Sequence, residues 1–207
     1  MAEKKPAGKR PSLEHLQLPE LAELNKGVVL EKFLAVKNFF EKQDALQLRV
    51  LANNVIKGAA LHNDRLLARI SVISYSLHKL LSKEHIVMGA NWGKNKKTVS
   101  NALDSAIFCL QKNDFKCFAE DLDNVAVQLE KVDAELGNFV KSLYEKARIK
   151  YAADAYYLGM SLSQAAELTG ADKKQLQEYV AFTKQHEEEK PAFGIKDRLN
   201  RLYKVIE

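Results

Sequence analysis

The sequence predicts an all-α fold, an antiparallel helical bundle followed by a smaller C-terminal helical unit. Apolar residues recur at spacings of three and four along most of the chain, which is typical of amphipathic helices. Only four prolines and nine glycines interrupt the 207 residues, which favours long helices over many short strands. The composition, 46% hydrophobic and 29% charged, is sufficient for a buried core.

The N-terminal end combines a charged tail with two short predicted helices. Residues 1–11 hold four cations against one acid, a net charge of +3, and are expected to form a flexible basic tail. Pro19 suits the first turn of a helix over 18–26, which Gly27 is expected to end. Helical spacing of large apolar residues indicates a second helix over 28–42, with Val29, Phe33, Val36 and Phe40 inside.

Two aspartates mark the starts of the next two helices. Asp44 is the expected N-cap of a helix that ends in a corner near Gly58 and residues 62–64. Asp64 then starts a strongly amphipathic helix. Its apolar stripe consists of Leu66, Leu67, Ile70, Ile73, Leu77, Leu80 and Leu81.

Residues 84–97 interrupt this pattern and are expected to form a loop, because turn-forming glycines and asparagines surround Trp92. Lysines beside an exposed indole can hold a phosphate backbone while the indole stacks on a base. Lys94, Lys96 and Lys97 are therefore candidate nucleic-acid contacts. The alternative is a solvated loop that Trp92 anchors to the core.

Two helices over 98–112 and 114–132 are expected to form an antiparallel pair, because the connection between them is short. Cys109 and Cys117 lie eight residues apart, which on one continuous helix is too far for a disulfide. The turn near 113–114 can bring them closer. The sequence favours two thiols in a reducing cytoplasm and leaves a bridge open.

A longer helix follows, with Asp133 as its expected N-cap and Gly159 as its end. Its expected inward positions are apolar, and four tyrosines add aromatic bulk. These residues are Leu136, Val140, Leu143, Tyr144, Ala147, Ile149, Tyr151, Tyr156 and Tyr157.

Residues 161–183 predict two short helices that meet at a glycine corner. Ser161 and Gln164 fit a capping box at the start of the first helix. Gly170 permits the positive φ that a tight corner often needs, and Asp172 is the expected cap of the second helix. Two helices that meet in this way can place the second one in a DNA groove.

Residues 166–170, Ala-Glu-Leu-Thr-Gly, with Leu176 and Tyr179 after them, resemble the core of MerR-type and excisionase-type helix-turn-helix domains. They also resemble a segment of small, uncharacterised archaeal all-helical proteins, some of them antitoxin-like regulators. In these families the residues after the corner open the helix that faces DNA. The resemblance therefore implies DNA contacts for Lys173, Lys174, Gln175 and Gln177.

Two features differ from these families. MerR-type domains place the unit at the N-terminus before a basic wing, whereas this segment lies late in the chain and no wing sequence follows. Three lysines and three acids also balance over 159–185, so phosphate contacts would need help from the tail, from 94–97 or from a second copy. The alternative is a helical hairpin that packs within the protein or holds a protein partner.

The last part of the chain predicts a charged linker, starting at His186, and an amphipathic helix over 195–206. A narrow apolar stripe lies between cations on that helix: Ile195, Leu199, Leu202 and Ile206. Such a helix docks on its own core, on a protein partner or on a second copy. The sequence thus divides into a tail (1–11), a bundle (12–158), a helix-turn-helix-like unit (159–185) and a linker with a final helix (186–207).

The remaining residues predict no enzyme, metal site or cofactor. His78 and His85 are the nearest approach to a metal pair, but no acid or cysteine completes the set at ligand spacing. Arg10 and His15 have the spacing of the Arg–His pair of all-helical ribonuclease toxins, but Arg10 falls in the expected tail and His15 lies just after it. No apolar run approaches the roughly 18 residues that span a bilayer.

The sequence therefore favours a non-catalytic, DNA-binding regulator in the cytoplasm, antitoxin-like by resemblance. Its expected ligand is double-stranded DNA. The alternative is a helical scaffold that binds a protein partner, or a second copy, through its C-terminal region.

Overall fold

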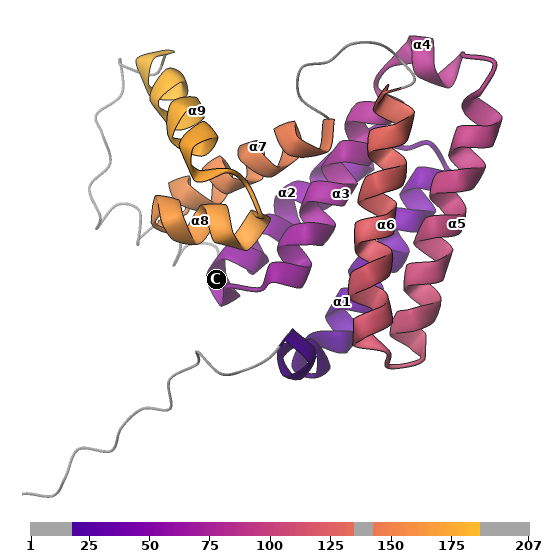
Figure 1. Cartoon of the computed structure of the whole chain (residues 1–207), viewed down its shortest axis with the longest axis horizontal. Coiled ribbons are helices and arrows are strands. Elements are labelled where there is room, and N and C mark those ends of the chain that lie inside the picture. Colours follow the sequence, from indigo (N-terminus) through magenta and orange to yellow (C-terminus); the bar gives the residue numbers. More distant parts are fainter. Residues whose placement is uncertain (1–17, 135–142, 187–207) are drawn as a thin grey trace, which may run out of the picture.

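The computed structural model describes the backbone of residues 18–134 and 143–186. Within these ranges the chain forms nine helices and no strand (Figure 1), which confirms the all-α prediction. The helices are α1 (Leu18–Glu41), α2 (Ala45–His62), α3 (Arg65–Leu81), α4 (Glu84–Val87), α5 (Trp92–Gln111), α6 (Phe115–Ala134), α7 (Leu143–Tyr157), α8 (Leu162–Thr169) and α9 (Lys173–His186).

Two helical hairpins form most of the bundle. α2 packs along α3, and α5 packs along α6, in the antiparallel arrangement that their short connections predict. α1 contacts both hairpins, whereas α7, α8 and α9 gather at the opposite side of the molecule from α5 (Figure 1).

α3 is the central helix of the bundle and contacts α1, α2, α6, α7 and α8. Its buried serines keep their hydroxyls satisfied by donating to backbone carbonyls, Ser71 and Ser74 to α2 and Ser76 to Val72 of α3 itself. Ser71 Oγ donates to the Ala52 carbonyl at 3.1 Å, and Ser74 Oγ donates to the Leu48 carbonyl at 2.8 Å. Small hydroxyl residues at this contact provide close packing without leaving a buried polar group unpaired.

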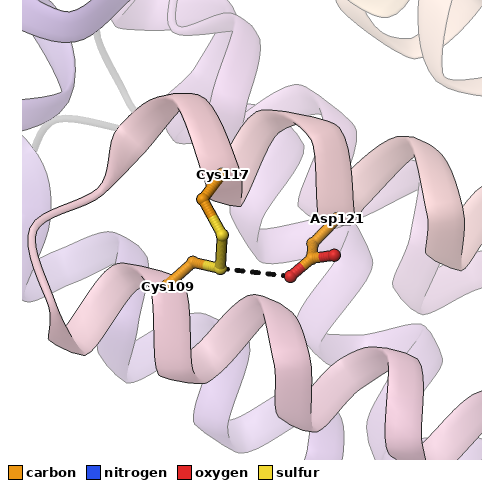
Figure 2. A group of neighbouring side chains, drawn as sticks. All are labelled: Cys109, Cys117 and Asp121. Atoms are coloured by element: carbon orange, nitrogen blue, oxygen red, sulfur yellow. Dashed lines mark hydrogen bonds between the residues drawn. A yellow bond between two sulfur atoms is a disulfide. The ribbon is translucent and has the colours of Figure 1, made fainter.

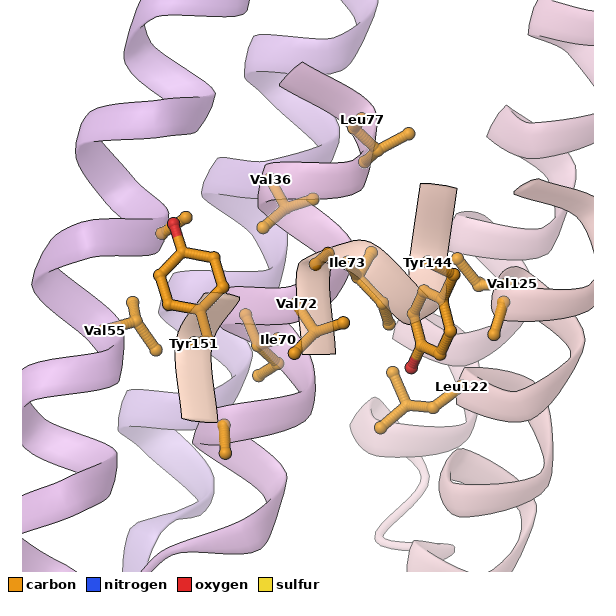
Figure 3. Close-up of a cluster of buried hydrophobic side chains, with 14 of the residues drawn as sticks. Val36, Val55, Ile70, Val72, Ile73, Leu77, Leu122, Val125, Tyr144 and Tyr151 are labelled. Atoms are coloured by element: carbon orange, nitrogen blue, oxygen red, sulfur yellow. The ribbon is translucent and has the colours of Figure 1, made fainter. Parts of the chain in front are cut away.

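α7 covers the core with two buried tyrosines. Tyr144 and Tyr151 lie among aliphatic side chains of the bundle (Figure 3), and the Tyr151 hydroxyl donates to Asn53 Oδ1 at 2.9 Å. The same apolar core continues into α8 and α9 through Ala165, Ala166, Leu168, Leu176 and Val180.

Three predicted boundaries are wrong. Gly27 does not end a helix, because α1 continues through it to Glu41. Gly27 is exposed, and a glycine inside a helix costs only about 1 kcal/mol, which the buried stripe from Val29 onward offsets. Asp133 is not the N-cap of a new helix, because it lies inside α6.

The third error is the loop predicted over 84–97. This segment forms α4 and the first turns of α5, and Trp92 is the first residue of α5. The indole is 9% exposed and packs edge-on against Phe40, with 6.3 Å between ring centroids. Burial of this ring fixes the start of α5, which outweighs the turn preference of the surrounding glycines and asparagines.

Several predictions lie outside the described residues: the basic tail over 1–11, the inward positions Leu136 and Val140, and the amphipathic helix over 195–206 with its stripe. None of the helices in the described ranges is both long enough and apolar enough to cross a membrane.

Candidate nucleic-acid interface

α8 begins with the capping box that the sequence predicts. The Ser161 hydroxyl accepts the Gln164 amide at 3.2 Å, and the Gln164 side chain accepts the Ser161 amide at 3.1 Å. Two of the amides that a helix start leaves unpaired are thus satisfied.

The corner after α8 depends on Gly170, which has a φ of 70°. This left-handed conformation lets the Ala171 amide donate back to the Ala166 carbonyl at 3.0 Å. Asp172 then caps α9, because its Oδ1 accepts the Gln175 amide at 2.8 Å. The predicted helices, corner and caps are therefore present.

The inner faces of α8 and α9 are small or aliphatic. Ala165 and Leu176 are fully buried, and both helices pack on α7. α8 also contacts α3. Alanines at this contact allow the helices to approach closely, as the sequence predicts.

The outer face of α9 carries the predicted contact residues. Lys173, Lys174 and Gln177 are exposed on its first two turns, whereas Gln175 is half-buried. The first two turns of α9 therefore present two cations and one exposed amide side chain. Glu178 is also exposed on this face.

Two arginines that are distant in sequence lie against this pair of helices. Arg65 of α3 forms an ion pair with Glu167 of α8. Arg148 of α7 lies beneath the corner, so that a Cβ added at Gly170 would be 3.7 Å from its guanidinium. Neither arginine could be recognised from the sequence, because neither belongs to a motif and only the packing of α3 and α7 brings them to α8.

Arg148 is held by an aromatic ring rather than by an acid. Its guanidinium carbon lies 4.6 Å from the centroid of the Tyr144 ring. Its buried Nε has no hydrogen-bond partner, and the guanidinium forms no ion pair with any described residue. Its positive charge is therefore not neutralised by a carboxylate within the described parts of the chain.

Further along α9, two aromatic side chains are exposed. Tyr179 is 40% exposed and Phe182 is 62% exposed. Partial burial raises the pKa of the Tyr179 phenol, and the Asp154 carboxylate adds to this shift. Asp154 itself pairs with Lys150 at 2.6 Å, so these two side chains add no net charge to the surface.

The lysines of α5 lie far from α9 (Figure 1). Lys94 and Lys97 are exposed on the first turns of α5. The Lys96 ammonium donates to the Glu41 carbonyl at 2.9 Å and so ties α5 to the end of α1. Because Trp92 is buried, the predicted stacking of its indole on a base is wrong; of the alternative, the attachment of Trp92 to the core is confirmed, but the segment that it attaches is the start of α5 and not a loop.

The predicted partner-binding residues Ile195, Leu199, Leu202 and Ile206 lie outside the described residues. His78 and His85, the two histidines with the spacing closest to that of a metal pair, lie on different helices. His78 belongs to α3, where its Nδ1 is 2.8 Å from the Ala45 carbonyl and burial lowers the pKa of the imidazole. His85 belongs to α4 and is exposed.

Cys109 and Cys117 form a disulfide between α5 and α6. The favoured prediction of two free thiols is therefore wrong, and the alternative that was left open is confirmed. The turn at 112–114 places the two Cα atoms 5.6 Å apart, a distance that a single helix cannot provide at this spacing.

No protein-family model matches the chain, and comparisons with curated proteins and with solved structures find no similar protein.

Proposed function

We propose that the chain is a non-catalytic, nucleic-acid-binding regulator of the cytoplasm that contacts double-stranded DNA through α8 and α9. The observation that carries this proposal is the exposed start of α9. Lys173, Lys174 and Gln177 project from the core immediately after the Gly170 corner. They are among the residues that the resemblance to MerR-type and excisionase-type units assigns to the DNA-facing helix.

Charge at the corner supports this assignment. The residues 159–185 are neutral on their own, which weakens a DNA contact because phosphates supply much of the affinity. Arg65 neutralises Glu167, and Arg148 adds a further cation beside Gly170. The surface around the folded corner is therefore more positive than the net charge of residues 159–185 alone indicates.

The residues have distinct roles in this proposal. Lys173 and Lys174 contact phosphates at the entrance of α9 into the major groove, and Arg148 adds a phosphate contact from beneath the corner. The exposed Gln177 reaches base edges, since a glutamine amide can pair with adenine. Gln175, half-buried beside the Asp172 cap, lies at the rim of the contact.

A double variant tests the proposal. We expect Lys173→Glu with Lys174→Glu to abolish binding of the full chain to a random duplex, measured by fluorescence anisotropy. The wild-type affinity should fall steeply between two salt concentrations. For a less drastic variant, Lys173→Gln with Lys174→Gln, the logarithmic salt slope should decrease by about 2, roughly one unit for each lost phosphate contact.

The matched control is Lys94→Glu with Lys97→Glu on α5. It makes the same change in net charge at exposed lysines on the other side of the molecule. Although the sequence also makes Lys94 and Lys97 candidate contacts, the proposal assigns the DNA contact to α9, so it requires this control to keep most of its affinity. If both double variants lose binding equally, net charge rather than α9 governs the interaction. Unchanged binding in the α9 variant would exclude the proposed contact.

The alternative function is a scaffold that binds a protein partner through the C-terminal region. The exposed Tyr179 and Phe182 on α9 favour it, because aromatic side chains are enriched at protein interfaces. In that case duplex affinity stays at background. Leu199→Asn with Leu202→Asn, in the segment after α9, would then release a co-purifying partner without reducing the helical content.

A further inference from the structure

The α5–α6 hairpin brings together three side chains that the proposed DNA contact does not use. Cys109 lies near the end of α5, whereas Cys117 and Asp121 lie on the first turns of α6 (Figure 2). Their potential ligand atoms are within 4.8 Å of one another. Cys109 Sγ lies 3.2 Å from Asp121 Oδ2. Two sulfurs and one carboxylate thus converge between two adjacent helices.

The backbone of the turn holds the two cysteines in place independently of their S–S bond. The Cys109 carbonyl accepts the Asp114 amide at 3.0 Å, and Asp114 Oδ1 accepts the Cys117 amide at 2.9 Å. Leu110 and Phe118, each next to one cysteine, are fully buried. Reduction of the disulfide therefore leaves the two sulfurs side by side.

Asp121 faces the sulfurs without a cationic partner. The carboxylate is half-buried, accepts the Ser105 hydroxyl at 2.6 Å and forms no ion pair with a described residue. A sulfur in a disulfide carries no hydrogen, so Cys109 can donate to Asp121 only after reduction. Reduction therefore places two potential thiolate ligands beside this carboxylate.

We propose that the reduced chain binds one Zn²⁺ through Cys109 Sγ, Cys117 Sγ and a carboxylate oxygen of Asp121. Thiolates favour soft divalent metals, and three protein ligands leave the fourth tetrahedral position of zinc to water. Because Cys109 is 4% exposed, the site is nearly closed on the side of α5. A closely placed cysteine pair in a reducing compartment is more often a metal or redox site than a structural bridge.

Metal binding and the disulfide exclude each other. On binding, each thiol gives up its proton, so two protons leave for each Zn²⁺ that enters. Oxidation by a small disulfide such as oxidised glutathione forms the Cys109–Cys117 bond and transfers two electrons to the oxidant. The S–S bond of the oxidant breaks, its two thiolates take up two protons, and Zn²⁺ is released. The bonded sulfurs of the structure correspond to the oxidised state of this pair.

Zinc titration of the full chain in both redox states tests the proposal. We expect the phosphine-reduced protein to take one Zn²⁺ per chain from a chromophoric chelator, with release of close to two protons near pH 7. Cd²⁺ in place of Zn²⁺ should produce the ultraviolet charge-transfer band of a cadmium thiolate. The oxidised protein should show neither. Equal uptake in the two states, or one metal shared by two chains, would overturn the site.

Two variants and a matched control identify the ligands. Cys117→Ser should lower zinc affinity by more than about 100-fold, and Asp121→Asn, which keeps an acceptor for Ser105, by roughly 10-fold or more. Glu120→Gln removes the adjacent, exposed carboxylate and should leave affinity unchanged. Circular dichroism checks that each variant keeps its helices, and if one does not, the oxidised wild type is the folded negative control. Wild-type affinity in folded Asp121→Asn or Cys117→Ser would contradict the assignment.

Discussion

The helix–helix corners of the bundle and those of the C-terminal helices close with the same backbone hydrogen bond, from an amide to the carbonyl five residues earlier, but they use different residues. In the bundle, Gln43, Asn63 and Asn113 adopt left-handed φ values of 56°, 51° and 61°. An aspartate follows each of them directly, donates its amide back to a carbonyl five residues earlier and caps the next helix. One residue thus serves as both the end of one helix and the start of the next.

The C-terminal corners insert one more residue. Gly159 and Gly170 take the left-handed position, with φ values of 116° and 70°. The following residue, Met160 or Ala171, makes the return hydrogen bond at 3.3 or 3.0 Å. Only then does the cap follow, as Ser161 or Asp172.

This difference in spacing accompanies a difference in geometry. The direct junctions at Asn63 and Asn113 join the antiparallel hairpins α2–α3 and α5–α6. After Gly170 and its extra residue, α9 leaves α8 at a wide angle (Figure 1). The wide angle leaves the first turn of α9 uncovered by the bundle. The number of residues between the left-handed residue and the next N-cap therefore indicates the angle between two helices as well as the glycine itself does.

The largest expected effect is at the joint between the two regions. Asp133 Oδ1 pairs with Lys83 at 2.9 Å, and Oδ2 accepts the Leu143 amide at 2.9 Å, so one buried carboxylate links α6, α7 and the segment before α4. We expect Asp133→Ala to lower the free energy of unfolding by about 3 kcal/mol, because a charge partner and a buried amide lose their acceptor. Urea unfolding of the variant and the wild type measures this difference in free energy.

Asp123→Ala is the control for this prediction. It removes a carboxylate that is 71% exposed and pairs with Arg69 on the surface. A loss under about 1 kcal/mol is expected for an exposed pair. Equal losses in the two variants would mean that Asp133 is not a joint between the bundle and α7.

A smaller effect distinguishes the two kinds of glycine. We expect Gly170→Ala to cost about 1 kcal/mol, because φ is positive and L-residues are disfavoured there. The added Cβ would meet Arg148 at an ordinary 3.7 Å, so crowding is not the cause. Gly27→Ala, in the middle of α1 with nothing within 4 Å, should instead stabilise by up to about 1 kcal/mol.

Thermal unfolding followed by circular dichroism measures both glycine variants. The identical chemical change should shift the melting temperature in opposite directions. If Gly170→Ala is neutral, the corner tolerates a left-handed alanine, and the sequence feature that suggested the DNA-binding unit loses its structural meaning.

These corners also explain how much the sequence could predict. The caps Asp44, Asp64, Ser161 and Asp172 were predictable, because side chain, turn residue and helix start lie within a few positions of one another. The α5–α6 pairing followed from its short turn. Local patterns of this kind carry their own physical reason.

The errors and omissions depend on contacts between distant residues. Burial of Trp92 against Phe40 converts a predicted loop into the start of α5. Arg148 reaches the Gly170 corner only because α7 packs against α8. The approach of Asp121 to the cysteine pair needs both helices of the hairpin in place. No spacing within one helix encodes such contacts.

The smallest effect tests whether the non-glycine corners of the bundle carry a backbone cost. Gln43 is exposed and has a φ of 56°, a conformation that a glutamine adopts only with strain. Gln43→Gly removes a left-handed penalty of about 1–2 kcal/mol but adds about 0.4–1 kcal/mol of unfolded-chain entropy, so the middle of these ranges gives a gain of about 0.8 kcal/mol. Asn63→Gly should gain less stability, because asparagine adopts the left-handed conformation more readily than glutamine.

Urea midpoints of the two variants show which one gains more stability. If Asn63→Gly gains more than Gln43→Gly, the left-handed residue does not govern the cost of these corners, and the spacing to the aspartate cap remains as the only difference between the two regions.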